Sequence, residues 1–203
     1  MLTSIRPDTF RQILLGAGIL FTRLDHHGIT TCAALRERMQ AAMDQPGALL
    51  GTTKGPGEIH IKPIYHQLSI NDLRTPTAGA LRVDGWTVRV TGTLAEVSPR
   101  PLAALLPFAQ VSQGEQCSRL SLSHQPAGAS AIPCLTWVGD LGMGLMVVDI
   151  PQAVNTLGVE LKLNPQGEGT IPFSFLGQLP LQEDGAAAPC AIHFFQEDRD
   201  HTP

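Results

Sequence analysis

The sequence is poor in the residues that mark several large classes of protein. Only 5% of its 203 residues are aromatic, its net charge is −4 at pH 7, and its only three lysines are Lys54, Lys62 and Lys162. Because clustered Lys and Arg carry affinity for the phosphate backbone, this composition disfavours a dedicated nucleic-acid-binding domain. The longest strongly apolar run near the start, Ile13 to Phe21, has nine residues, about half of what a membrane-spanning helix needs. We therefore expect no membrane anchoring and no secretory signal.

Motifs for catalysis and ligand binding are also lacking. The four cysteines lie far apart and form no C-x-x-C pair, so we expect reduced thiols. Residues 51–55 contain the glycines and lysine of a phosphate-binding loop in the wrong order. His60 and His66 share one face of an expected strand but lie roughly 20 Å apart along it, too far to bind one metal ion. The sequence thus predicts no enzyme, and no catalytic, cofactor-binding or metal-binding residues.

Glycine and proline, by contrast, are abundant. The 20 Gly and 16 Pro together make 36 of 203 residues, about 18% of the chain, whereas their average usage in proteins is roughly 12%. Hydrophobic residues are 43% of the chain, enough for a sizeable core. These values predict one domain over residues 1–203 that is mainly β. We expect an antiparallel β-sandwich or barrel with a flanking α-helix and a long protruding loop or arm.

Alternating and helical patterns locate the elements of the first half. The clearest strand covers Ala80 to Val97, where Trp86, Val88, Val90 and Leu94 share one face. We expect that face to pack on an opposed sheet or on a helix capped by Thr30 or Thr31, whose apolar side carries Leu35, Met39 and Met43. The alternate residues of the strand form a wet face that we expect to line a lumen: Thr87, Arg89, Thr91 and Thr93.

Further segments are assigned in the same way. Strands are expected within residues 10–21, 118–124, 134–138, 145–150 and 191–195, a short helix over Leu102 to Leu106, and a helical turn over Pro151 to Leu157. A hairpin is expected from Val159 to Phe175, with these side chains pointing inward: Leu161, Leu163, Phe173 and Phe175. Residues 196–203 form a polar tail.

A long segment punctuated by glycine and proline, residues 51–85, is the most unusual feature. Within it, Glu58 to Ser69 is an extended stretch, and Pro63 restricts it to an edge strand or a protruding arm because proline cannot donate a ladder hydrogen bond. Ordering such an arm alone is entropically costly, so we expect a neighbouring copy to order it. The residues expected to act in assembly are Lys54, Gly55, Gly57, His60, Lys62, His66, Arg74 and Pro76.

Five segments resemble the tail tube proteins, or major tail proteins, of long-tailed bacteriophages. Residues 48–57, ALLGTTKGPG, are similar to the family's LLGATKGG segment. Residues 72–79 are similar to its DG-x-R-x-P-x-x-G loop, with Thr77-Ala78-Gly79 departing from the usual residues. The long strand that ends at residues 94–97 comes next, and residues 94–106 are similar to the segment that leads into the family's short helix. Residues 169–175 and 189–194 resemble its closing strands. The resemblance covers most of Ala48 to Phe194 in the same order.

The resemblance implies a structural virion protein located in the phage tail and assembled in the host cytoplasm. Six copies would close into a ring whose strands form a continuous barrel, and rings would stack into the tube through which DNA is ejected. The implied partners are further copies of the chain, the tape-measure, terminator and baseplate proteins, and the genome only transiently. The family supplies no catalytic or cofactor-binding residues.

Two alternatives remain open from the sequence. One is another ring-forming tail component: a tail terminator, a distal tail protein or the tube protein of a contractile injection system. The other is a β-barrel enzyme or ligand-binding protein whose site assembles from distant residues, the first candidates being His60, His66, Glu96 and Asp149. A deep apolar pocket with converging titratable groups would favour the second alternative.

Overall fold

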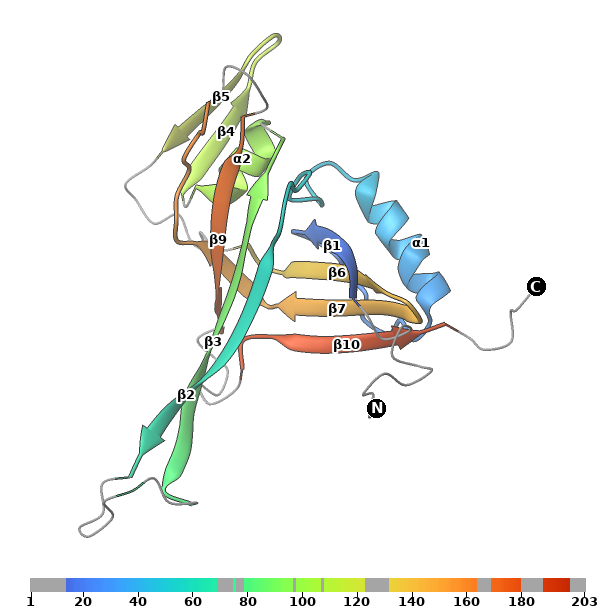
Figure 1. Cartoon of the computed structure of the whole chain (residues 1–203). Helices are drawn as coiled ribbons and strands as arrows, with labels where there is room; N and C mark the ends of the chain where they lie inside the picture. The colour runs from blue at the N-terminus through green and yellow to red at the C-terminus, as the bar shows by residue number, and fades with distance from the viewer. Residues whose placement is uncertain are drawn as a thin grey trace, which may run out of the picture.

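The computed structural model describes residues 14–68, 75, 79–96, 98–106, 108–122, 132–163, 169–179 and 188–197, with side chains from residue 18 onward. These residues form two four-stranded antiparallel sheets, a small two-stranded sheet and two short helices in a sandwich-like arrangement (Figure 1). The expected mainly β fold class is therefore confirmed. The predicted assembly residues Arg74 and Pro76, and most of segment 196–203, lie outside the described residues.

Each sheet combines strands that are distant in sequence. The first sheet has the order β1 (Leu14–Phe21), β6 (Leu135–Leu141), β7 (Gly144–Ile150), β10 (Ala191–Gln196). The second has the order β2 (Glu58–Gln67), β3 (Leu81–Leu94), β9 (Ile171–Gln178), β8 (Gln152–Asn155). The small sheet pairs β4 (Ala109–Gln113) with β5 (Ser118–Leu122). β2 is an edge strand, as Pro63 predicted.

The main core lies between the two large sheets. Val88, Val90 and Leu94 of β3 are buried in one cluster with residues of the first sheet, among them Trp137, Val148 and Ile150. This confirms for Val88, Val90 and Leu94 that the apolar face of β3 packs on an opposed sheet, whereas Trp86, expected on the same packed face, is 36% exposed. Gly92 provides space in this core, because a Cβ there would lie 2.6 Å from the ring of Phe173.

Helix α1 (Cys32–Met43) covers the other face of the first sheet (Figure 1). It begins where predicted, since the Thr31 hydroxyl accepts a hydrogen bond from the Ala34 backbone N–H at 3.3 Å. Leu35 is fully buried in a second cluster with Phe21 and Val147. The helix therefore packs on the first sheet and not on β3, and the first sheet is covered on both faces. Within the described residues, neither helix is long and apolar enough to cross a membrane.

A buried asparagine joins the short helix α2 (Pro99–Leu105) to the second sheet. The amide of Asn155 donates to the backbone carbonyls of Leu105 at 2.8 Å and Gly158 at 2.7 Å. Its carbonyl oxygen accepts from the Ser174 backbone N–H at 2.9 Å. A buried amide needs such partners to offset its desolvation, and here they fix α2 against the end of β8.

Two sequence predictions for the second half are wrong. Residues 151–157 do not form a helical turn, because β8 pairs with β9 as a strand there. In the described part of the expected hairpin of 159–175, residues before and after the turn pair only through an isolated bridge between Lys162 and Thr170. Leu161 and Leu163 consequently point outward and are exposed, whereas Phe173 and Phe175 are buried as expected.

Candidate assembly surface

The β2–β3 hairpin extends beyond the sandwich as a two-stranded ribbon (Figure 1). Its proximal half lies over the core, where Ile59 and Ile61 pack against buried residues of the second sheet. Its distal half, residues 64–67 paired with 81–85, lies beyond the part of β3 that pairs with β9, and nearly all of its described side chains are exposed. An isolated two-stranded ribbon of this kind is marginally stable in water, so its distal half needs further contacts.

A β-bulge keeps most of the large apolar residues of the distal ribbon on one face, although Ile64, which is 51% exposed, lies on the other. Ile64 pairs with Gly85 and Tyr65 pairs with Val83, so Asp84 is the extra residue. Without the bulge, Val83 would lie on the face opposite Trp86, because successive strand residues alternate. The extra residue shifts the alternation of β3 by one position, so Val83 and Leu81 lie on the same face as Trp86. This is the face that packs on the core in the proximal half of the hairpin.

We define the distal stripe as the apolar side chains on this continued face: Tyr65, Leu81, Val83 and Trp86. Each is large, and each is 36–58% exposed. Single exposed apolar residues are normal, but a continuous row on a thin ribbon marks an interaction surface. The distal stripe is thus an extension of the core face without a covering layer.

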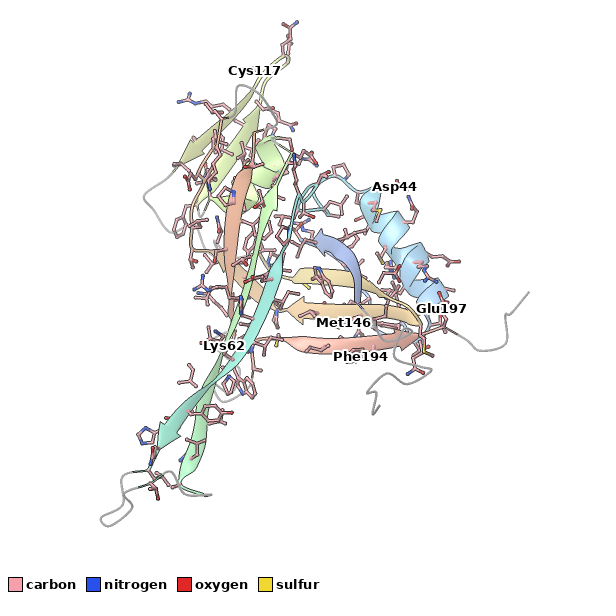
Figure 2. The ribbon with its side chains drawn as sticks, viewed as in Figure 1. Asp44, Lys62, Cys117, Met146, Phe194 and Glu197 are labelled. Carbon is pink, nitrogen blue, oxygen red and sulfur yellow. The ribbon has the colours of Figure 1, made fainter. Side chains whose placement is uncertain are left out.

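A second apolar patch lies at the β10 edge of the first sheet. Phe194 is 66% exposed and pairs in register with Met146 of β7 (Figure 2). Ile192 of the same strand pairs with Val148. We define the β10 rim as Ile192 and Phe194 together with the half-buried Met146. These side chains share the face that points toward the second sheet but lie where that sheet does not cover them. The outer edge of β10 pairs with no other strand among the described residues.

The predicted lumen-facing row lies on the outer face of the second sheet. Thr87, Arg89, Thr91 and Thr93 alternate with the buried residues of β3 and are half-buried. The Arg89 guanidinium donates to the hydroxyls of Ser174 at 2.6 Å and Thr156 at 3.0 Å. These bonds hold the only cation of the row against the sheet.

The predicted assembly residues fall into two groups. The connector that contains Lys54, Gly55 and Gly57 runs beside the end of β3, with the Lys54 N–H bonded to the Thr93 carbonyl at 2.9 Å. A Cβ at Gly57 would lie 3.2 Å from the Thr91 carbonyl, so this connector packs closely and does not protrude.

The remaining described residues of the set lie on the ribbon. His60 Nε2 lies 2.7 Å from Glu58 Oε2, within hydrogen-bond distance, Lys62 is exposed, and His66 lies 3.8 Å from Asp84. Only the part from residue 64 onward leaves the sandwich, so the protruding arm is shorter than residues 51–85.

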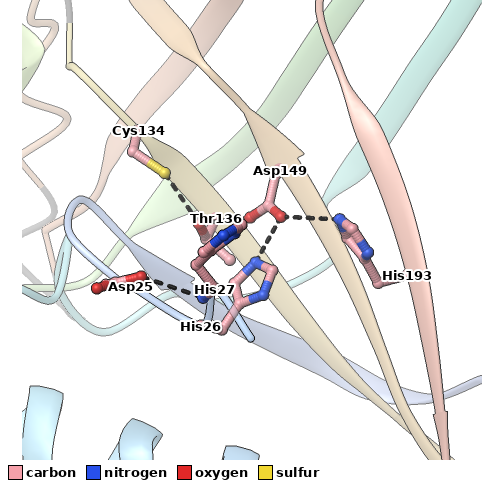
Figure 3. Close-up of polar contacts among 7 residues, drawn as sticks. All are labelled: Asp25, His26, His27, Cys134, Thr136, Asp149 and His193. Atoms are coloured by element: carbon pink, nitrogen blue, oxygen red, sulfur yellow. Dashed lines mark hydrogen bonds and ion pairs between the residues drawn. The ribbon is translucent and has the colours of Figure 1, made fainter. Parts of the chain in front are cut away.

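The structure does not bring together the four candidates of the enzyme alternative. His60 and His66 lie on the ribbon, and Glu96 approaches the Thr52 N–H at 3.4 Å. Asp149 lies in the first sheet, where it meets His26 and His193 (Figure 3). Sequence reasoning missed this contact, since the three residues are far apart along the chain and belong to no motif.

An apolar pocket of about 270 Å³ opens between the sheets beside the connector. Leu20, Trp137, Met146 and Phe173 line it, and among its described lining residues the only titratable one is Glu58. This pocket therefore lacks converging titratable groups; such groups, His26, Asp149 and His193, line a separate pocket on the other side of the first sheet.

No protein-family model and no curated protein matches this sequence. Three features of the structure therefore bear on the function: the distal stripe, the β10 rim and the polar outer face of the second sheet.

Proposed function

We propose that this chain is a structural subunit that assembles with copies of itself into rings, and that the rings stack into a phage tail tube. The observation that carries the proposal is the distal stripe, an apolar face kept in phase with the core by a β-bulge and left uncovered in a single copy. A face of this kind is stabilised when a neighbouring copy covers it.

The two apolar patches support a ring rather than a symmetric dimer. The distal stripe lies on the ribbon of the second sheet, and the β10 rim lies on the edge of the first sheet. A contact between two different patches is heterologous, and repetition of such a contact closes a ring when the rotation permits. We expect the stripe of one copy to pack on the rim of the next.

The polar outer face of the second sheet suits the wall of a DNA conduit. Its threonine row is uncharged, and the hydroxyl partners of Arg89 occupy its guanidinium. A conduit must not bind DNA tightly, and affinity for DNA grows with each cation that contacts a phosphate. We therefore assign Thr87, Thr91 and Thr93 to the lumen. The tape-measure, terminator and baseplate partners and the location in the virion tail belong to the same proposal.

Deletion of residues 64–77 tests the role of the ribbon. Because the core lies between the sheets and not in the distal ribbon, we expect the shortened chain to fold and to remain a monomer. Circular dichroism and thermal unfolding check the fold, and sedimentation velocity with negative-stain electron microscopy checks assembly. Normal tubes from the deleted chain would show that the ribbon is not the assembly element.

A terminator or another ring-forming tail component would use the same surfaces. Polymer length separates these functions, because a terminator forms one ring and a tube protein forms many stacked rings. Electron microscopy of the purified chain decides between them.

A further inference from the structure

Two histidines and one aspartate from separate segments converge beside the β10 edge (Figure 3). His26 belongs to the loop after β1, Asp149 to β7 and His193 to β10. Asp149 Oδ2 lies 2.5 Å from His26 Nε2 and 3.3 Å from His193 Nε2. The three atoms all lie within 4.8 Å of one another.

The surroundings hold the carboxylate in a fixed orientation. The Thr136 hydroxyl donates to Asp149 Oδ1 at 2.8 Å, which leaves Oδ2 directed at the two imidazoles. The side chains of His26 and Asp149 are only 13% and 16% exposed, whereas His193 is 45% exposed. The group is therefore largely buried on one side and open to solvent on the other. Metal ligands are commonly oriented by outer partners such as this threonine.

We propose that His26 Nε2, Asp149 Oδ2 and His193 Nε2 form a binding site for a divalent transition metal of the zinc type. Imidazole nitrogen and carboxylate oxygen are ordinary Zn²⁺ ligands, at about 2.0–2.2 Å from the ion. In a tetrahedral site such ligands lie about 3.3 Å apart. The Asp149–His193 separation already has this value, whereas the 2.5 Å hydrogen bond between His26 and Asp149 has to lengthen when an ion replaces its proton. The fourth position faces solvent on the side of His193, where water completes the coordination.

The bound ion would link the loop after β1 to two strands of the first sheet. His193 is on the edge strand, so coordination fixes β10 to its neighbours through a side-chain bond as well as its backbone ladder. This site is separate from the distal stripe and does not depend on the proposed assembly.

The test is metal binding by the full-length chain, made without a histidine tag and freed of metal with a chelator. Isothermal titration with ZnCl₂ at neutral pH is expected to give one equivalent bound with micromolar or tighter affinity. Co²⁺ is expected to give the visible absorption bands of a tetrahedral site. His193→Ala, on an exposed edge strand, removes a ligand and is expected to lower the affinity by more than the roughly 10–100-fold typical of losing an outer partner.

The matched control is His27→Ala, which removes an imidazole from the same loop but not from the three ligands. It is expected to bind Zn²⁺ like the wild type. Thr136→Val is expected to weaken binding by roughly 10-fold, since it frees Asp149 Oδ1 without removing a ligand. Absence of saturable binding by the folded wild-type chain would overturn the proposal. So would equal loss of affinity in His27→Ala and His193→Ala.

Discussion

Tyr65→Ser is the substitution that best separates folding from assembly. Tyr65 lies on the distal ribbon opposite Val83 and is 58% exposed, so its side chain contributes little to the core of a single copy. Exposed substitutions of this kind usually change the free energy of unfolding by about 0.5 kcal/mol or less. In the proposed ring, by contrast, a neighbouring copy covers the same side chain.

The expected effect on assembly follows from the exposed fraction. Complete burial of a large apolar side chain contributes about 1.5–3 kcal/mol, so the 58% that remains exposed leaves about 1–2 kcal/mol to be gained at each contact. A ring of six contains six such contacts, and their combined loss is roughly 5–10 kcal/mol. At 1.4 kcal/mol per factor of ten, the equilibrium constant for ring formation falls by about four orders of magnitude or more.

The assay compares wild type, Tyr65→Ser and His66→Ser at equal concentration by sedimentation velocity and electron microscopy. His66 is the next residue of the same strand, points to the opposite face and is also exposed. The sequence placed it among the assembly residues, but it lies away from the distal stripe, so the contact proposed here does not use it. We expect Tyr65→Ser to remain monomeric with an unchanged melting temperature, and His66→Ser to assemble. Assembly of Tyr65→Ser at the wild-type concentration, or equal impairment of both variants, would refute the reasoning.

Three further predictions concern the subunit itself. Leu94→Asp places an unpaired charge in the core at a fully buried position, so we expect a loss above about 4 kcal/mol and no folded protein by circular dichroism. Asn155→Ala removes the side-chain partner of four backbone groups and should lower the free energy of unfolding by about 3 kcal/mol or more in urea titrations; a loss below about 1 kcal/mol would contradict this. Burial raises the pKa of the Cys190 thiol, so less thiolate forms at neutral pH, and iodoacetamide should alkylate the exposed Cys117 first by mass spectrometry; the reverse order would contradict it.

The elements with strong local patterns could be predicted from sequence. β3 alternates within the sandwich, from Thr87 to Leu94, because Val88, Val90 and Leu94 are buried on one face, and Pro63 restricted β2 to an edge. Helix α1 carries both a cap and a helical apolar spacing. In these segments the local preference and the tertiary environment agree, so the pattern alone was sufficient.

The elements that sequence reasoning missed depend on contacts between distant residues. β8 has only four residues and is held by pairing with β9 and by the bonds of Asn155, none of which leaves a periodic signal. Leu161 and Leu163 alternate as the residues of a half-buried strand do, yet both are exposed. Among the described residues, the segment that contains them forms a single bridge, between Lys162 and Thr170.

Neither the distal stripe nor the histidine–aspartate group could be predicted, for a similar reason. The stripe depends on a bulge at Asp84, which shifts the phase of β3 by one residue and cannot be read from alternation. The group depends on the register of β7 with β10 and on the position of the loop that carries His26. Both arise from tertiary pairing.

Negative-stain electron microscopy of the purified full-length chain at high concentration tests the central claim most directly. We expect rings or stacked tubes of uniform diameter in the absence of any other protein. Dispersed single subunits, with sedimentation values of a monomer at the same concentration, would contradict the account.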